Sequence, residues 1–83
     1  MTNQEKLRQL KKAAATLRSS RKVEVRFGEY GQYYYEPLRV AAKHVNVGET
    51  YLLQGWRRYG FGRDGMWEYE GDVEVTIAES TEV

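Results

Sequence analysis

The chain contains no cysteine, a single proline and no long hydrophobic run. Without cysteine there is no disulfide framework, no thiolate metal ligand and no cysteine nucleophile. No apolar segment approaches the roughly 18 residues that a membrane helix needs, and no hydrophobic region marks a secretion signal. We therefore expect a cytoplasmic protein that has no membrane partner.

Aliphatic side chains are scarce as well. Leu, Ile, Val and Phe together account for 17 of the 83 residues. This fraction is only slightly above the level below which highly charged chains are typically intrinsically disordered. Seven tyrosines and two tryptophans supply further apolar surface for a core. The net charge of +1 is too small for charge repulsion to prevent the chain from folding. Residues 1–83 are therefore expected to form a single domain around one core.

Charge is distributed unevenly along the chain. Residues 1–22 carry seven basic side chains and one acidic one, whereas residues 68–83 carry six acidic side chains and no basic one. Such asymmetry is typical of an interaction arm. It is equally typical of two ends that lie close together in the fold, or that pair between the subunits of a homodimer, so the alternatives stay open.

The N-terminal segment is predicted to form a helix over about residues 3–19. Thr2 and Glu5 have the spacing of a capping box, which satisfies amide groups at a helix start. Apolar residues recur on one helical face at Leu7, Leu10, Ala14 and Leu17. The helix is expected to end near Ser19, because hydroxyl side chains compete for backbone hydrogen bonds.

From residue 22 onward the apolar residues alternate, which indicates short antiparallel strands over about residues 22–78. Glycines and the single proline punctuate them into strands at residues 23–27, 33–35, 51–59, 66–69 and 73–77. Gly71 and Asp72 are expected to form the break between the last two of these strands. Residues 38–47 fit either a short strand with a loop or one helical turn, and the tail 79–83 is expected to fray.

The fold class predicted from these elements is α+β. One N-terminal helix packs on a four- to five-stranded antiparallel sheet that is strongly curved. The alternative is a small closed barrel of the SH3-like or OB-like kind, in which the helix covers an open end.

A glycine-rich segment, Gly60 to Gly65, has the GxGxxG spacing of a dinucleotide-binding loop. That chemistry needs a helix directly after the loop, whereas the β-prone residues 66–69 follow. The segment also lacks the aromatic strand positions of an RNA-recognition motif. We interpret it as a hairpin loop and expect no cofactor.

No catalytic or metal-binding set assembles from the sequence. His44 is the only histidine, and no spacing places it with a serine and a carboxylate as a triad, or with enough ligands for a metal. The carboxylate pairs Glu68/Glu70 and Asp72/Glu74 are more typical of a solvated face than of an acid–base pair. We expect no enzymatic activity and no metal ion.

Aromatic and arginine side chains are the most informative feature. A small sheet with one helix cannot bury aromatic residues on both faces, so several of them are expected to be exposed. Tyrosine, tryptophan and arginine dominate binding hot spots. The candidate partner-binding residues are Tyr34, Trp56, Arg57, Arg58, Tyr59, Phe61, Arg63 and Trp67. One of the adjacent pair Arg57 and Arg58 is expected to lie against an aromatic ring of the neighbouring strand.

The leading hypothesis is a small non-enzymatic protein-interaction domain, of the kind by which bacterial or phage proteins inhibit or adapt a larger macromolecular machine. The alternative is a nucleic-acid-binding domain whose tyrosines and tryptophans stack on bases. In that alternative a basic helix contacts phosphates through Arg8, Lys11, Lys12 and Arg18. A solvated polar face is the simpler interpretation of the same helix.

Overall fold

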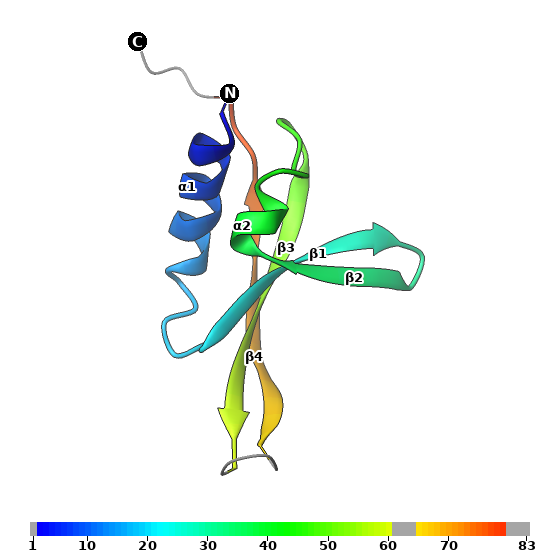
Figure 1. The fold of residues 1–83 in the computed structure, drawn as a ribbon. Coiled ribbons are helices and arrows are strands. Elements are labelled where there is room, and N and C mark those ends of the chain that lie inside the picture. The colour runs from blue at the N-terminus through cyan, green and yellow to red at the C-terminus, as the bar shows by residue number, and fades with distance from the viewer. Residues whose placement is uncertain (1, 61–64, 80–83) are drawn as a thin grey trace.

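The computed structural model describes residues 2–60 and 65–79, so most of the tail expected to fray lies outside the described residues. The elements in chain order are α1 (Asn3–Ala14), β1 (Lys22–Glu29), β2 (Gln32–Pro37), α2 (Leu38–Ala41), β3 (Thr50–Tyr59) and β4 (Met66–Thr76) (Figure 1). The strands form one antiparallel sheet in the order β2-β1-β3-β4. The α+β class, with an N-terminal helix on an antiparallel sheet, is confirmed. Over the described residues the sheet has four strands and stays open, so the closed barrel is not found.

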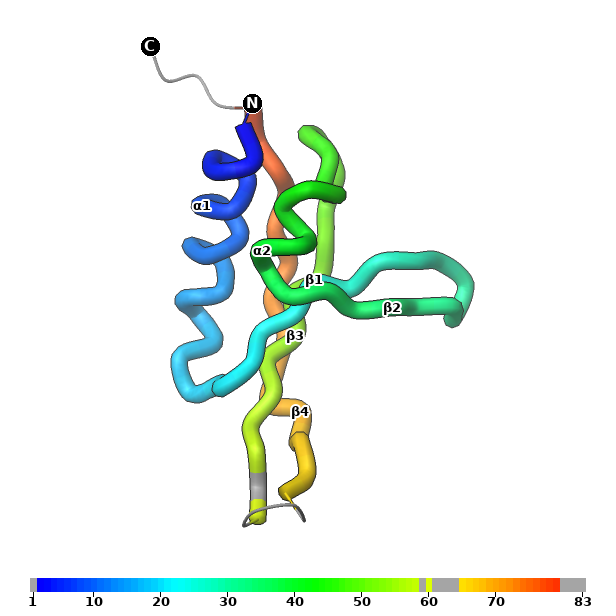
Figure 2. Tube along the Cα trace, in the orientation of Figure 1, coloured from blue at the N-terminus to red at the C-terminus, as the bar shows by residue number. Residues whose placement is uncertain are grey.

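β1 changes its neighbours part-way along its length. Residues Lys22–Arg26 pair with β3, whereas residues Glu24–Glu29 pair with β2. Because β1 and β3 separate after Arg26, the β1–β2 hairpin leaves the body as an arm, and the β3–β4 hairpin extends in another direction (Figure 2). The molecule is accordingly elongated, with extents of 48 × 29 × 18 Å.

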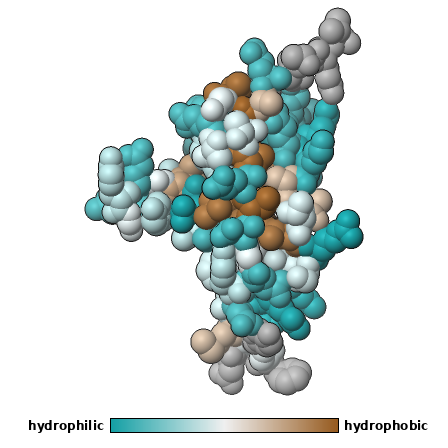
Figure 3. Space-filling view, turned by 180° about the vertical axis from the view of Figure 1, so that it is seen from behind, coloured by the Kyte–Doolittle hydropathy of each residue, from teal (hydrophilic) through white to brown (hydrophobic). Residues whose placement is uncertain are grey.

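The core lies between one face of the sheet and the two helices. Its buried side chains are Leu10, Val25, Ala41, Ala42, Val45, Leu53 and Ile77. Residues 38–47, which were ambiguous in the sequence, form α2 and the turn after it, and they supply three of these side chains. Leu7, Ala14, Val23, Val73 and Val75 pack around them, as expected of the helix stripe and its strand partners. Seen from behind, hydrophobic side chains gather along the middle of the body, between hydrophilic ones (Figure 3).

α1 begins where the sequence predicts and ends earlier. The Thr2 side chain accepts a hydrogen bond of 3.2 Å from the backbone amide of Glu5, which caps the first turn. After Ala14, the hydroxyl of Thr16 donates to the carbonyl of Ala13. The competition expected at Ser19 is thus already present at Thr16. Within the described ranges, neither helix has the length and apolarity required to cross a membrane.

β4 is one continuous strand, so the interruption predicted at Gly71 and Asp72 is wrong. Gly71 lies directly opposite Gly55 of β3, and the ladder continues beyond it in both directions. The irregularity falls one residue further along, where Gly55 pairs with Gly71 but Trp56 pairs with Tyr69. Glu70 is the extra residue of this β-bulge. Pairing with β3 has overridden the local turn preference of the Gly-Asp dipeptide.

The segment that follows α1 packs against the paired glycines Gly55 and Gly71, and it approaches Gly55 more closely. A Cβ atom added at Gly55 would clash with the Ser20 hydroxyl and would lie 3.4 Å from the Cβ of Leu17. A Cβ added at Gly71 would lie 3.8 Å from Leu17, which is an ordinary contact. Gly55 is therefore required for the close approach of residues 17–20, and Gly71 is not.

Candidate interaction surface

Among the described residues, both helices pack on the same face of the sheet, and neither α1 nor α2 covers the other face. Successive residues of a strand point to opposite faces, so the residues that alternate with the buried Val25 and Leu53 lie away from α1 and α2. We call this surface the open face. Its aromatic and basic members, ordered from β2 to β4, are Tyr33, Tyr35, Arg26, Lys22, Trp56, Arg58, Trp67 and Tyr69.

Lys22 and the rings of Trp56, Trp67 and Tyr69 contact one another where β1, β3 and β4 lie side by side. The ammonium of Lys22 lies 4.3 Å from the ring centre of Trp67 and 5.9 Å from that of Trp56. Trp56 and Tyr69 are directly opposite in register and meet edge to face, with ring centres 5.6 Å apart. These contacts fix the orientation of the rings before any partner arrives.

A second cation–ring pair lies on the arm. The guanidinium carbon of Arg26 is 4.3 Å from the ring centre of Tyr33, and Tyr35 is directly opposite Arg26 in register. The exposed fractions of Tyr33, Tyr35, Trp67 and Tyr69 lie at 43%, 41%, 44% and 45%. Each ring therefore rests on the protein and still offers a large part of its area to another molecule.

The open face carries charges of both signs. Its acidic members, Glu24, Asp72 and Glu74, equal in number the basic side chains Lys22, Arg26 and Arg58. The Tyr69 hydroxyl donates a hydrogen bond to Asp72, and this bond raises the pKa of Tyr69 above its ordinary value. Lys22 also lies 3.6 Å from a carboxylate oxygen of Glu24. A surface of balanced charge does not concentrate phosphates as a basic one does.

The structure divides the predicted partner-binding residues between the two faces. Trp56, Arg58 and Trp67 meet on the open face, where Arg58 and Trp67 are directly opposite. Arg57 points to the other face, and its guanidinium lies 3.7 Å from Glu70. Lys22 of β1 lies over Trp67, a contact that the sequence did not predict.

The remaining predicted partner-binding residues lie elsewhere. Tyr34 is on the helix-side face of the arm, and its ring stacks on Phe27 with centres 5.5 Å apart. Tyr59 is in β3, opposite Met66. Phe61 and Arg63 lie outside the described residues.

The predicted phosphate-binding residues do not join the open face. Arg8, Lys11, Lys12 and Arg18 are exposed on α1 and the turn after it. α1 packs through Leu10 on the opposite face of the sheet. The open-face rings Tyr33, Tyr35, Trp56 and Trp67 and the predicted phosphate contacts are thus on opposite sides of the sheet.

α1 lies against the segment that directly follows β4. The Gln9 side chain donates to the carbonyl of Ala78 over 2.7 Å and accepts from the amide of Ala78 over 2.9 Å. Of the interpretations of the charge asymmetry, proximity of the two ends within the fold is therefore found.

Sequence reasoning missed Lys22 and Arg26 as members of this surface. Their alternation with Val23 and Val25 does place them opposite the core. The missing information was the strand order, because only the position of β1 between β2 and β3 brings both cations next to aromatic rings.

A second feature is a cavity of about 420 Å³ at the place where β1 separates from β3. We call it the fork pocket, and its lining includes Phe27, Glu29, Tyr34, His44, Glu49 and Tyr51. The Tyr51 hydroxyl donates to a carboxylate oxygen of Glu49 over 3.0 Å and accepts from the backbone N–H of Asn46 over 2.8 Å. Burial raises the pKa of Tyr51 above its ordinary value of 10.0, and Glu49 adds to the rise.

Among residues 2–60 and 65–79, no group of three or more His, Asp or Glu side chains is arranged to hold a metal ion. In comparisons with known proteins, no family model, no curated protein and no solved structure matches this chain.

Proposed function

We propose that the chain is a non-enzymatic protein-interaction domain that docks a protein partner on its open face. The observation that carries the proposal is the uncovered row of aromatic rings, interleaved with cations, across all four strands. Tyrosine, tryptophan and arginine contribute most to binding energy when an interface excludes water from them. Rings that are already held in place lose little conformational entropy on binding.

The chemistry of the open face favours a protein over a nucleic acid. Proteins that bind single strands combine stacking rings with a basic groove on the same surface. Here the open face carries acids and bases in equal number, and the basic side chains of α1 lie on the other side of the sheet. A mixed surface suits the polar and charged rim of a protein interface. By occupying a surface of its partner, such a domain inhibits or adapts a larger assembly without chemistry of its own.

The test starts by capturing the partner with the tagged protein from a bacterial lysate, followed by affinity measurements with the purified partner. Trp67→Ala and Arg58→Ala alter the open face. Arg57→Ala and Glu68→Ala are matched controls, because these residues project from the opposite face of the same two strands, β3 and β4. We expect the first two variants to weaken binding by about tenfold or more and the two controls to bind as the parent protein does.

Thermal melts of all four variants separate loss of binding from loss of fold. Equal affinities for the open-face variants and the parent would place the working surface elsewhere. A fall in affinity with salt by about 0.9 log units per log unit of salt for each neutralised phosphate would favour the nucleic-acid alternative.

A further inference from the structure

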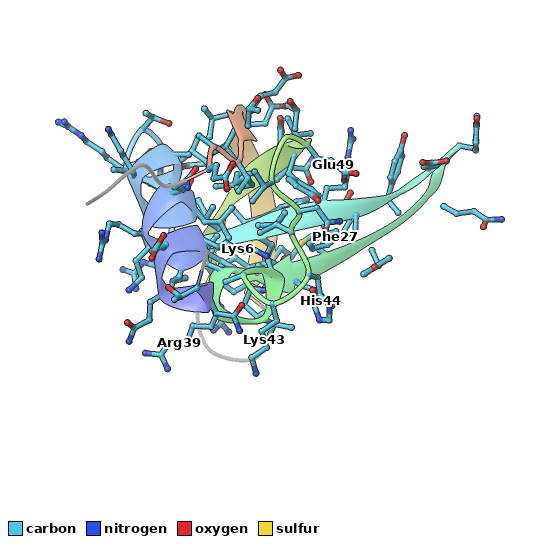
Figure 4. The ribbon with its side chains drawn as sticks, turned by 90° about the horizontal axis from the view of Figure 1, so that it is seen from above. Lys6, Phe27, Arg39, Lys43, His44 and Glu49 are labelled. Atoms are coloured by element: carbon cyan, nitrogen blue, oxygen red, sulfur yellow. The ribbon has the colours of Figure 1, made fainter. Side chains whose placement is uncertain are left out.

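The fork pocket is a separate feature from the open face. It opens because the pairing of β1 with β3 ends at Arg26 and Leu52, whereas β1 continues along β2 as far as Glu29. The resulting gap of about 420 Å³ is within the range of small-molecule sites, roughly 300–1,000 Å³. Figure 4 places Phe27, His44 and Glu49 around the base of the arm.

Aromatic rings from three different strands line the pocket. Phe27 is central: its ring centre lies 5.5 Å from that of Tyr34 and 5.5 Å from that of Tyr51. The Phe27 and Tyr34 rings are nearly parallel, at 21°, whereas the Tyr51 ring is tilted by 60°. The imidazole of His44 meets Phe27 edge to face at 6.4 Å. Ring faces carry partial negative charge and attract cations.

Carboxylates line the same cavity. Glu29 and Glu49 are both exposed residues at its wall, and Glu49 is held by the hydroxyl of Tyr51. The one arginine at the wall, Arg26, directs its guanidinium to Tyr33 on the open face. The side chains that enclose the cavity therefore combine aromatic rings with two carboxylates.

We propose that the fork pocket binds a guanidinium group. A guanidinium is planar, so it lies flat on a tyrosine or phenylalanine ring while its N–H groups donate to a carboxylate. An ammonium is a compact, strongly hydrated charge that uses the flat rings less well. The ligand is either an arginine side chain of a protein or a free guanidinium compound, since both present the same group.

The experiment titrates the full chain with four probes and follows backbone amide NMR shifts of Phe27, Glu49 and Tyr51. Two probes are the blocked tripeptide Gly-Arg-Gly and the same peptide with citrulline, which replaces the guanidinium by a neutral urea of similar shape. The third is ethylguanidinium, a free guanidinium compound with no second charge, and the fourth is the peptide with lysine. We expect the arginine peptide to bind at least about tenfold more tightly than the citrulline peptide, since charge-assisted hydrogen bonds are lost.

Two variants locate the binding in the pocket. Glu49→Gln keeps an acceptor for the Tyr51 hydroxyl and removes the charge, and it should weaken guanidinium binding by about tenfold. Glu74→Gln is the matched control on the open face and should leave the affinity unchanged. Tyr34→Leu removes a largely exposed ring and should also weaken binding, with the parent's thermal melt retained.

Three results would each contradict guanidinium binding in the fork pocket. Equal binding of the arginine and citrulline peptides, equal binding of the lysine peptide, or an unchanged affinity in Glu49→Gln would overturn the proposal. Tighter binding of the peptide than of ethylguanidinium identifies a protein arginine as the ligand, and the reverse order identifies a free compound. Because the titration uses small guanidinium probes and no protein partner, its result does not depend on the function proposed for the open face.

Discussion

Lys22 and Trp67 contact each other across an intervening strand. Lys22 begins β1 and Trp67 is in β4, and β3 lies between the two strands. The Lys22 ammonium nevertheless lies 4.3 Å from the centre of the Trp67 ring, and it lies 5.9 Å from the centre of the Trp56 ring of β3. One lysine thus joins three strands of the open face.

The first prediction concerns this contact. Lys22→Gln should lower the free energy of unfolding by about 0.5–1 kcal/mol, because it removes a cation from the face of a partly exposed ring. Urea denaturation measures the change. Lys11→Gln, on the exposed side of α1, is the control and should remain within about 0.5 kcal/mol of the parent. Indistinguishable losses for the two lysines would show that the contact adds no stability.

The second prediction concerns the docking of α1. Leu10 is fully buried among residues that include Val25, Leu53 and Ile77. Leu10→Ala removes this packing and leaves a cavity, so the free energy of unfolding should fall by about 2–5 kcal/mol. A loss of less than about 0.5 kcal/mol in urea denaturation would mean that α1 is a detached arm.

The third prediction uses the paired glycines. Gly55→Ala should destabilise the protein by about 1–3 kcal/mol, since its methyl group meets Ser20 and Leu17 in a packed region. Gly71→Ala, on the opposite strand, places its methyl group at ordinary contact distance from Leu17. In thermal melts, Gly71→Ala should therefore have a clearly higher melting temperature than Gly55→Ala. The reverse order would contradict the packing of residues 17–20 across β3.

The fourth prediction concerns Tyr51. Its pKa in the folded protein is above the ordinary value of 10.0, first because of burial and then because of Glu49. NMR titration of the tyrosine Cζ resonances should show this elevation, and Glu49→Gln should reduce it. The raised pKa contributes stability that is fully present below pH 10 and is lost as the pH rises through the folded pKa. Tyr51→Phe should therefore lose less stability than the parent between pH 9 and 11, which about spans the ordinary tyrosine pKa.

The sequence was sufficient for the elements whose signals are local. The cap at Thr2, the stripe around Leu10 and the alternation of Val23 and Val25 each depend on neighbours within a few residues, and each appears in the structure. The exposure of aromatic rings also followed, because a four-stranded sheet offers too little interior for them.

The features that the sequence did not provide depend on residues far apart in the chain. The bulge at Glu70 arises from the pairing of β4 with β3. The residues around Gly71 alone predicted a break between two strands at that position. The fork pocket requires the divergence of β1 from β3, which follows from strand order. For the same reason Tyr34 and Trp67, both predicted to bind a partner, occupy different faces.

The divergence of β1 also divides the chain's resistance to local unfolding. Residues 24–26 of β1 have a strand on both sides, whereas residues 27–29 have only β2. An isolated two-stranded ribbon is marginally stable, so its outer part opens without disturbing the ladder between β1 and β3. Amide hydrogen exchange therefore divides β1 into two cooperative units, fast toward Glu29 and slow around Val25. A partner that touches both the arm and the body would join these units, and the slowing of exchange in the arm would record its binding.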